Sequence, residues 1–456
     1  MPAKKQKKAA KSSFDLAEVK FDGLAGDIIS QAKKMGATAV EVDAGVSSGF
    51  SVNVRKNKVE TIEHSNGKTL GVTVYFGCCT GSATTSDLKP QAIQAMLEKA
   101  CHIARFTSVD PFVGLADPEL MAYGYQDLDL DLYHPWQIKV EEAIDLAKNA
   151  EAKGFSYDKR LVNSEGASLD TFKSFNLYAN SHGFCGTTDT TRHSFACAFI
   201  AEEKDEMQRD YYYTVARDAC DLENADQVAM QAAKRTINRL NAQRITTREC
   251  PIVFSAEIAS GFIGNFIRAI AGGNIYRKAS FLLGSLQKPV FAKHINIEEN
   301  PLLPKALGSA AFDGEGVKLF RNNIVVDGIL QRYVLDSYSA RKLKMKTTGN
   351  ASGVHNLIIK TNELDLNGLL CKMGTGLLVT ELMGDGVNIV TGDYSRGIFG
   401  YWVENGTIQY PVTGVTIAGN LKDMLLNIVA VGNDIDYRSN ILTGSILLDK
   451  MTVAGS

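Results

Sequence analysis

Apolar residues recur at two kinds of spacing along the chain, and these spacings predict the order of its elements. Residues 21–35 carry apolar side chains three and four positions apart, which predicts a helix that stops at Gly36. The runs TAVEVDAGV, FSVNVRK, KVETIEH and TLGVTVYFG follow, separated by Gly, Ser and Asn-Gly breaks typical of strands. Helical spacing resumes in SDLKPQAIQAMLEKACHIARF. This order predicts an α+β layer in which helices cover one face of a β-meander.

The same order returns after a connector at residues 110–135, which contains proline, glycine and the run DLDLDL. The segment KVEEAIDLAKNAEAKGF predicts a helix, and ADQVAMQAAKRTINRLNA predicts another. Between them, SFNLYANSHGFCGTTDTTRHSFACAFIAEE and DYYYTVARD predict strands. We therefore predict a second helix-covered unit, although the two units show no repeat at the level of residues.

From Thr246 onward glycine becomes frequent, and short β-rich runs alternate with turns. Asn405-Gly406, between two apolar-rich runs, predicts a hairpin. The segment FSAEIASGFIGNFIRAI, residues 254–270, has the spacing of a helix with one buried face. The predicted fold class is α+β, with two helix-covered antiparallel β-meander units followed by a β-rich C-terminal domain. The predicted domains are a disordered basic tail at 1–20, an N-terminal α+β domain at 21–115, a central α+β domain at 116–245 and a C-terminal domain at 246–456.

Composition narrows the class of protein and its surroundings. Of the 456 residues, 45% are hydrophobic and 22% charged, as in globular proteins. A net charge of −2 gives no general attraction to nucleic acid or to membranes. No apolar run approaches the roughly 20 residues that span a bilayer, and the eight cysteines include no C-x-x-C pair. We expect a cytoplasmic protein with reduced thiols and with neither a nucleic-acid nor a membrane partner.

The histidine positions offer no local metal site. No two of the seven histidines lie three to five positions apart, so no single helix or turn supplies the paired imidazoles typical of zinc sites. We therefore assign no metal ligand, although a site assembled from distant residues stays open.

Charged residues gather in one basic segment and in a glycine-rich turn. The segment SYSARKLKMKTTGN carries Arg341 and Lys342, and GDYSRG carries Asp393 and Arg396. Such residues can belong to solvated loops, or they can line a substrate channel in which an arginine or lysine holds peptide carbonyls or a carboxylate. We take these four residues as candidate substrate-binding residues.

Three segments resemble the TldD/PmbA family: DSYSARKLKMKTTGNASGVHN, TGDYSRGIFGYWVENGTIQYP and TIAGNLKDMLLNIVAVGNDID. The resemblance extends in order and spacing from about Phe21 to the C-terminus. It implies a cytosolic bacterial or archaeal protein linked to zinc-dependent peptide cleavage. It also implies action on poorly structured peptides, including peptide-antibiotic precursors and an antitoxin.

The TldD branch of this family carries H-E-x-x-x-H, and a later cysteine completes its zinc site. Aligned with SAEIASG, this motif places Ser255 and Ser260 at the histidine positions and Ala256 at that of the glutamate base. The cysteine position falls near Thr443. Neutral hydroxyls are poor zinc ligands, and Glu257 lies one residue past the expected base, rotated about 100° around a helix. The chain therefore resembles the PmbA branch, also called TldE.

The resemblance implies that this chain has no catalytic residue and no cofactor, and that zinc resides in a TldD-type paralogue. The two chains would form a heterodimer that cleaves unfolded peptides, with a homodimer when the chain is alone. Two alternatives stay open: the chain is itself a metallopeptidase with unrecognised ligands, or it is a non-hydrolytic peptide-binding homodimer. The small residues at the vacated positions would line an emptied site or simply let the helix pack closely on a sheet.

Overall fold

The computed structural model describes residues 21–204 and 206–455, and the predicted basic tail lies outside them. The chain divides into two compact units. The first comprises residues up to Ser47, Asn66–Leu115 and Lys173–Thr190; the second comprises Ser48–Ser65, Ala116–Phe172 and the residues from Thr191 onward. The domain boundaries drawn from the sequence stay a prediction.

Six strands form one sheet in the order β3-β2-β1-β4-β5-β6. Their bounds are β1 (Ala39–Arg55), β2 (Lys58–Phe76), β3 (Cys79–Thr85), β4 (Leu161–Asn180), β5 (Cys185–Glu203) and β6 (Glu206–Ala216). Strand β2 pairs antiparallel with β3, and β5 pairs antiparallel with β6. The two predicted meanders are therefore neighbours in a single sheet, and β6 is one of its edges.

In the first unit, helices α1 (Phe21–Lys34) and α2 (Pro90–Phe106) cover their part of this sheet. Their apolar stripes meet the inward side chains of the strands in one core, where Ile28, Val42 and Leu97 are almost completely buried. This confirms the prediction of strands flanked by two helices.

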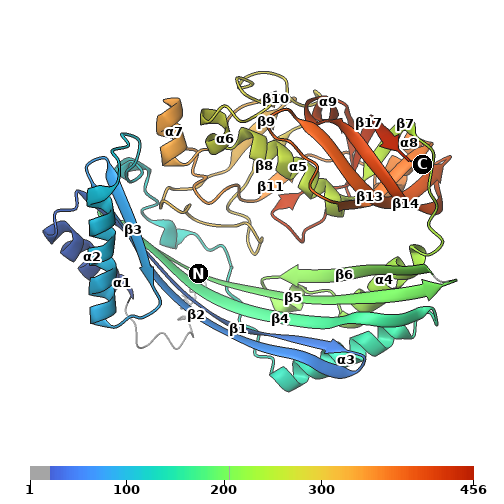
Figure 1. The fold of residues 1–456 in the computed structure, drawn as a ribbon, viewed down its shortest axis with the longest axis horizontal. Helices are drawn as coiled ribbons and strands as arrows, with labels where there is room; N and C mark the ends of the chain where they lie inside the picture. The colour runs from blue at the N-terminus through green and yellow to red at the C-terminus, as the bar shows by residue number, and fades with distance from the viewer. Residues whose placement is uncertain (1–20, 205, 456) are drawn as a thin grey trace, which may run out of the picture. The chain divides into compact units, whose positions relative to one another are not determined.

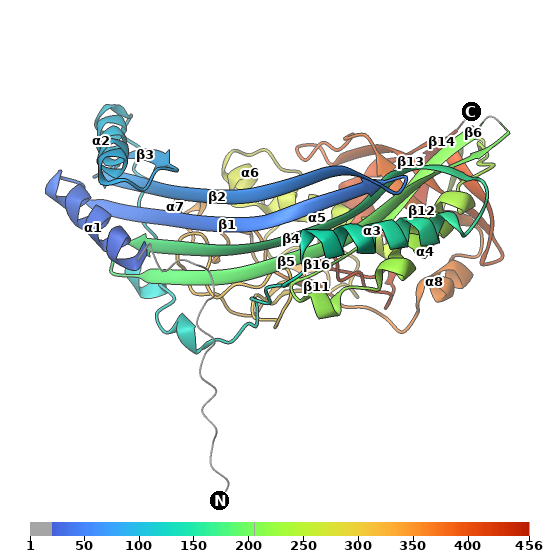
Figure 2. The same ribbon diagram turned by 90° about the horizontal axis from the view of Figure 1, so that it is seen from below.

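In the second unit, helices α3 (Val140–Phe155) and α4 (Ala225–Asn238) lie side by side on the strands (Figure 2). Alanine lines their contact faces, so the backbones approach closely. At Gly154 a Cβ atom would lie 2.1 Å from the ring of Phe199, so only glycine fits under that ring. Three short 3₁₀ turns flank these helices, at Pro118–Leu120, Tyr125–Asp127 and Ala219–Asp221.

The C-terminal part of the second unit contains two further sheets (Figure 1). One has the order β14-β13-β12-β7-β17-β15, and the other β10-β9-β8-β11-β16. The strands of the first are β7 (Arg248–Phe254), β12 (Gly376–Met383), β13 (Asp393–Glu404), β14 (Thr407–Asn420), β15 (Ile428–Val431) and β17 (Ile446–Ala454). Those of the second are β8 (Ile297–Glu299), β9 (Asn322–Val326), β10 (Ile329–Leu330), β11 (Leu357–Ile359) and β16 (Ile441–Leu442).

The predicted hairpin joins β13 to β14, and both Asn405 and Gly406 have the positive φ that such a turn needs (50° and 74°). The predicted helix at residues 254–270 is α5 (Ala256–Ile270). It begins two residues later than predicted because Phe254 is the last residue of β7 and pairs with Val379 of β12. Its apolar face is buried in the core of this part. The remaining helices are α6 (Gly272–Tyr276), α7 (Ser337–Leu343), α8 (Leu366–Met373) and α9 (Leu421–Leu426). Among the described residues, we find no helix with the length and apolarity to cross a membrane.

Candidate functional site at the start of helix α5

The first turn of α5 carries the small residues identified in the sequence. Ser255 is the N-cap residue, but its side chain makes no capping hydrogen bond, and its buried Oγ has no hydrogen-bond partner among the described residues. The cap comes instead from Ser445, whose Oγ accepts the N–H of Ala256 at 3.0 Å and donates to Asp434 at 2.6 Å. Helix capping therefore does not explain the serine at position 255.

Charged side chains surround the next residue, Glu257. Its Oε2 accepts a hydrogen bond from Nη1 of Arg235 at 2.8 Å, and Nη2 of Arg438 lies 3.7 Å from its Oε1. Arg235 also lies 3.4 Å from Asp210. Arg438 contacts both carboxylate oxygens of Asp436 at 2.9 Å. We call these five residues the Glu257 cluster; they join α4, α5, β6 and the segment after β15.

The cluster also covers part of the free edge of β6. Nη1 of Arg438 donates to the carbonyl of Tyr213 at 3.2 Å, and the Asp210 carboxylate accepts the N–H of Tyr211 at 2.7 Å. The guanidinium of Arg438 lies 4.9 Å from the ring centre of Tyr212, a cation–π distance. A further strand pairing with β6 at these positions would have to displace these two contacts.

Mutual pairing fixes the charges of the cluster. Burial would lower the pKa of Arg438, but the hydrogen bonds and negative charges of Asp436 and Glu257 outweigh it and raise that pKa. Burial would likewise lower the pKa of Arg235, but Glu257 and Asp210 outweigh burial and raise that pKa. Both guanidiniums are therefore cationic at every physiological pH.

Two cavities lie on either side of Glu257. The first has a volume of about 440 Å³ and the second about 420 Å³. Side chains of a strand alternate between its faces, so Tyr211 and Tyr213 line the first cavity while Tyr212 and Thr214 line the second. The first cavity is also lined by Asp210, Arg235, Ile258, Ser260, Gly261, Asn265, Arg268, Thr380, Glu381, Leu382, Asp385 and Arg396. The second is also lined by Val215, Asp221, Glu223, Ser255, Ala256, Leu366, Asp434, Ile435, Asp436, Tyr437, Arg438 and Ser445.

The vacated positions are divided between these cavities. Ser255 and Ala256 line the second cavity, and Ser260 lines the first. Thr443 is fully buried, lines neither cavity and donates its hydroxyl to the carbonyl of Gly444 at 3.0 Å.

The candidate substrate-binding residues are dispersed. Arg396 lines the first cavity, where its Nε donates to the carbonyl of Met383 at 3.2 Å. Asp393 is exposed at the start of β13 and lines neither cavity. Arg341 and Lys342 lie on α7 and also line neither cavity; Nζ of Lys342 is 5.2 Å from the ring centre of Tyr338. Of the four, only Arg396 therefore lies at the start of α5.

The donor groups at the start of α5 do not fit a zinc ion. Zinc sites in proteins use imidazole nitrogens, thiolates and free carboxylates, whereas this turn offers hydroxyls and a carboxylate already bound to arginine. Over residues 21–204 and 206–455, no group of three or more His, Cys, Asp or Glu side chains is arranged to hold a metal ion.

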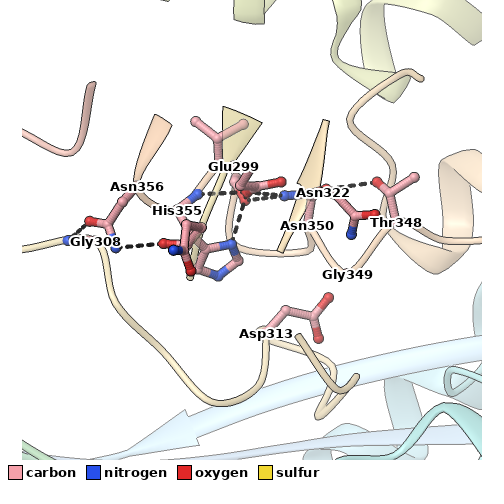
Figure 3. A network of polar contacts seen from close by, with 12 residues as sticks. Glu299, Gly308, Asp313, Asn322, Thr348, Gly349, Asn350, His355 and Asn356 are labelled. Atoms are coloured by element: carbon pink, nitrogen blue, oxygen red, sulfur yellow. Dashed lines mark hydrogen bonds and ion pairs between the residues drawn. The ribbon is translucent and has the colours of Figure 1, made fainter. Parts of the chain in front are cut away.

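A second polar network includes residues of one of the three segments that carried the resemblance, DSYSARKLKMKTTGNASGVHN (Figure 3). The buried Glu299 carboxylate accepts the backbone N–H and Nδ1 of His355, at 2.8 and 3.0 Å, and the amide of Asn350 at 2.8 Å. It also pairs with Arg332. Burial would raise the pKa of Glu299, but these partners lower it, so the carboxylate stays ionised. The network holds the segment around residue 350 against β8 and β11.

Three domain profiles match the chain in order. They are PmbA/TldA metallopeptidase domain 1 at residues 40–104, the central domain at 133–240 and the C-terminal domain at 247–455. The chain belongs to the PmbA/TldD metallopeptidase family. This confirms the resemblance drawn from the three sequence segments.

Relatives within the family cover nearly the whole chain. Metalloprotease PmbA of Escherichia coli O157:H7 is 46% identical over 98% of this chain and 95% of its own length. A metalloprotease PmbA homologue of Haemophilus influenzae is 47% identical, over 94% of each chain.

Solved structures agree with the fold. A protein of Bacteroides thetaiotaomicron described as a putative modulator of DNA gyrase superimposes with a TM-score of 0.91 at 26% identity, over 95% of this chain and 99% of the other. TldE of Thermococcus kodakarensis, at 17% identity, has a TM-score of 0.80 over 94% and 99% of the two chains.

Proposed function

We propose that this chain is the PmbA/TldE-like subunit of a cytoplasmic metallopeptidase, and that its partner is a TldD-type paralogue that carries the zinc. This proposal is carried by the chemistry at the start of α5. Ser255 and Ser260 stand at the histidine positions of the family motif, Ala256 stands at the position of its glutamate base, and Glu257 is bound by two arginines. A carboxylate held in this way is a poor general base, because its basic oxygens are already hydrogen-bonded to cations.

In this proposal the assembly acts on unfolded peptides, such as precursors of peptide antibiotics and an antitoxin. The subunit would contribute a binding surface, and the paralogue would contribute the reacting groups. The two cavities beside Glu257 support the first role, since they offer polar, charged and aromatic walls within one region of the second unit.

The test is to purify the chain, the TldD-type paralogue of the same organism and the pair, and to measure zinc content and cleavage of an unfolded peptide for each. We expect no stoichiometric zinc and no cleavage for the chain alone, and chelator-sensitive cleavage for the pair. One tightly bound zinc per chain, with cleavage in the absence of the paralogue, would show that the chain is itself a peptidase. Peptide binding with no cleavage by the pair would favour the non-hydrolytic homodimer.

A further inference from the structure

The charges that line the first cavity divide into paired and unpaired groups. Arg235 is bound to Glu257 and Asp210. Arg239, which lies behind the wall, is bound to Asp210 at 3.4 Å and to Glu381 at 2.6 Å. The lining carboxylates Asp210, Glu257 and Glu381 are therefore all engaged by arginines within the protein.

Two arginines on the same cavity have no such partner. Arg268 makes a weak contact of 3.5 Å with the amide of Asn265, and Arg396 donates its Nε to the carbonyl of Met383. Within the described part of the chain, neither guanidinium forms an ion pair. Among the described residues that line this cavity, Asp385 is the one carboxylate outside any ion pair, so two guanidiniums and one carboxylate remain without a charged partner.

Each of these two arginines contacts a group that is itself held by the fold. Asn265 is more than nine-tenths buried on α5, and its amide donates to the carbonyl of Gly261 at 3.1 Å. Arg396 lies on β13, in the interior of a sheet, and the Met383 carbonyl engages its Nε, which leaves its terminal nitrogens as donors. A guanidinium held by one edge in this way is suited to a carboxylate, which it can bind with two parallel hydrogen bonds.

The wall formed by β6 is aromatic. The rings of Tyr211 and Tyr213 stack with their centres 6.3 Å apart and their planes at 21°. Together with Ile258 and Leu382 they give the cavity an apolar surface beside its two arginines. A volume of about 440 Å³ lies within the usual range for small-ligand pockets, roughly 300–1,000 Å³.

We propose that the first cavity binds a carboxylate of the peptide substrate, with Arg268 and Arg396 as its ligands and the tyrosine wall receiving a neighbouring apolar side chain. The proposal rests on the proposed function, since it takes the bound molecule to be an unfolded peptide. The carboxylate comes from an Asp or Glu side chain or from the C-terminus of the peptide; both present the same two oxygens.

The experiment measures binding, by calorimetry at low salt, of the full-length chain to four unstructured peptides that share one sequence with a central Phe-Glu. The peptides combine Glu or Gln at that position with a free or an amidated C-terminus. We expect the Glu or the free-carboxylate peptide to bind at least about tenfold more tightly than the amidated Gln peptide, since hydrogen bonds to charged groups have this strength. Which of the two gains affinity identifies the source of the carboxylate.

Variants test the assignment of the arginines. Arg268→Gln and Arg396→Gln should each reduce the carboxylate preference several-fold, and Arg396→Lys should restore part of it. Arg277→Gln is the matched control, because Arg277 is exposed like Arg268, contacts Asn274 and Tyr276, and lines neither cavity. Equal affinity for all four peptides, no measurable binding, or an unchanged preference in both Gln variants would overturn the proposal. None of these results bears on whether the pair cleaves peptides, which the zinc and cleavage assays decide.

Discussion

Replacing Arg235 with methionine tests whether the Glu257 cluster holds the start of α5 in place. Arg235 bridges Glu257 and Asp210, at 2.8 and 3.4 Å, and its side chain is only 20% exposed. Methionine keeps much of the volume of the arginine stem and removes the charge. Among the described residues, Arg438 at 3.7 Å would be the one cation left beside Glu257, and Arg239 the one left beside Asp210.

The expected cost follows from burial. Removing one partner of a buried ion pair costs about 3–5 kcal/mol, because the other charge stays desolvated. The side chain of Glu257 is 20% exposed, and Arg438 remains beside it as a second cation. We therefore place the loss of unfolding free energy at the lower end of this range, about 3 kcal/mol. Adding Glu257→Gln to Arg235→Met should recover about 1–2 kcal/mol of it, since the stranded charge is then gone.

The assay is denaturant unfolding followed by tryptophan fluorescence, since Trp136 and Trp402 both lie in the second unit. Arg321→Met is the control: its pair with Glu298 measures 2.5 Å, but the arginine is 69% exposed, so solvent screens the pair and the expected loss is much smaller than that of Arg235→Met. The reasoning is refuted if both arginine variants lose the same stability, or if the double variant is no more stable than Arg235→Met.

Three other predictions concern stability. Ser445→Ala removes the cap on the N–H of Ala256 and should cost about 1 kcal/mol in denaturant unfolding. Gly154→Ala forces a Cβ into the ring of Phe199 and should cost about 1–3 kcal/mol, whereas an alanine at the exposed Gly261 meets nothing within 4 Å and should not destabilise the protein. Burial raises the pKa of Glu315 from 4.5 to about 7, so the folded chain keeps a proton that the unfolded chain loses as the pH rises through this interval. Stability should therefore fall by up to about 3 kcal/mol between pH 5 and 8, and Glu315→Gln should flatten that part of the profile; an unchanged profile would contradict the assignment.

Local patterns predicted much of the fold. The apolar spacing at residues 21–35 corresponds to α1, and Asn405-Gly406 forms the turn between β13 and β14. Such features depend on neighbours in sequence, where side-chain periodicity and turn chemistry act. The joining of the two meanders in one sheet depends on strands more than 100 residues apart, β1 and β4, and local spacing does not encode it.

The sequence predicted the α5 residues of the candidate site but not the residues that pair with Glu257. Ser255, Ala256 and Ser260 were found because a family motif defines those positions, whereas the partners of Glu257 carry no local signal. Arg235 reads as one more charge on an amphipathic helix, and Arg438 as a loop residue. Their roles arise from contacts spanning 22 and 181 residues, which only the folded chain creates.

Strand β17 comes late in the sequence but lies inside the C-terminal sheet. Its residues, Ile446–Ala454, pair with β7 on one side and β15 on the other, so this late segment is an interior strand. Ser445, immediately before it, caps α5. During synthesis, nearly two hundred residues must therefore be added after β7 before β17 can pair with it and Ser445 can cap α5. Until then, one edge of β7 can pair with other chains. Removing the nine residues of β17 would therefore delete an interior strand of this sheet and leave the edge of β7 that it covers unpaired.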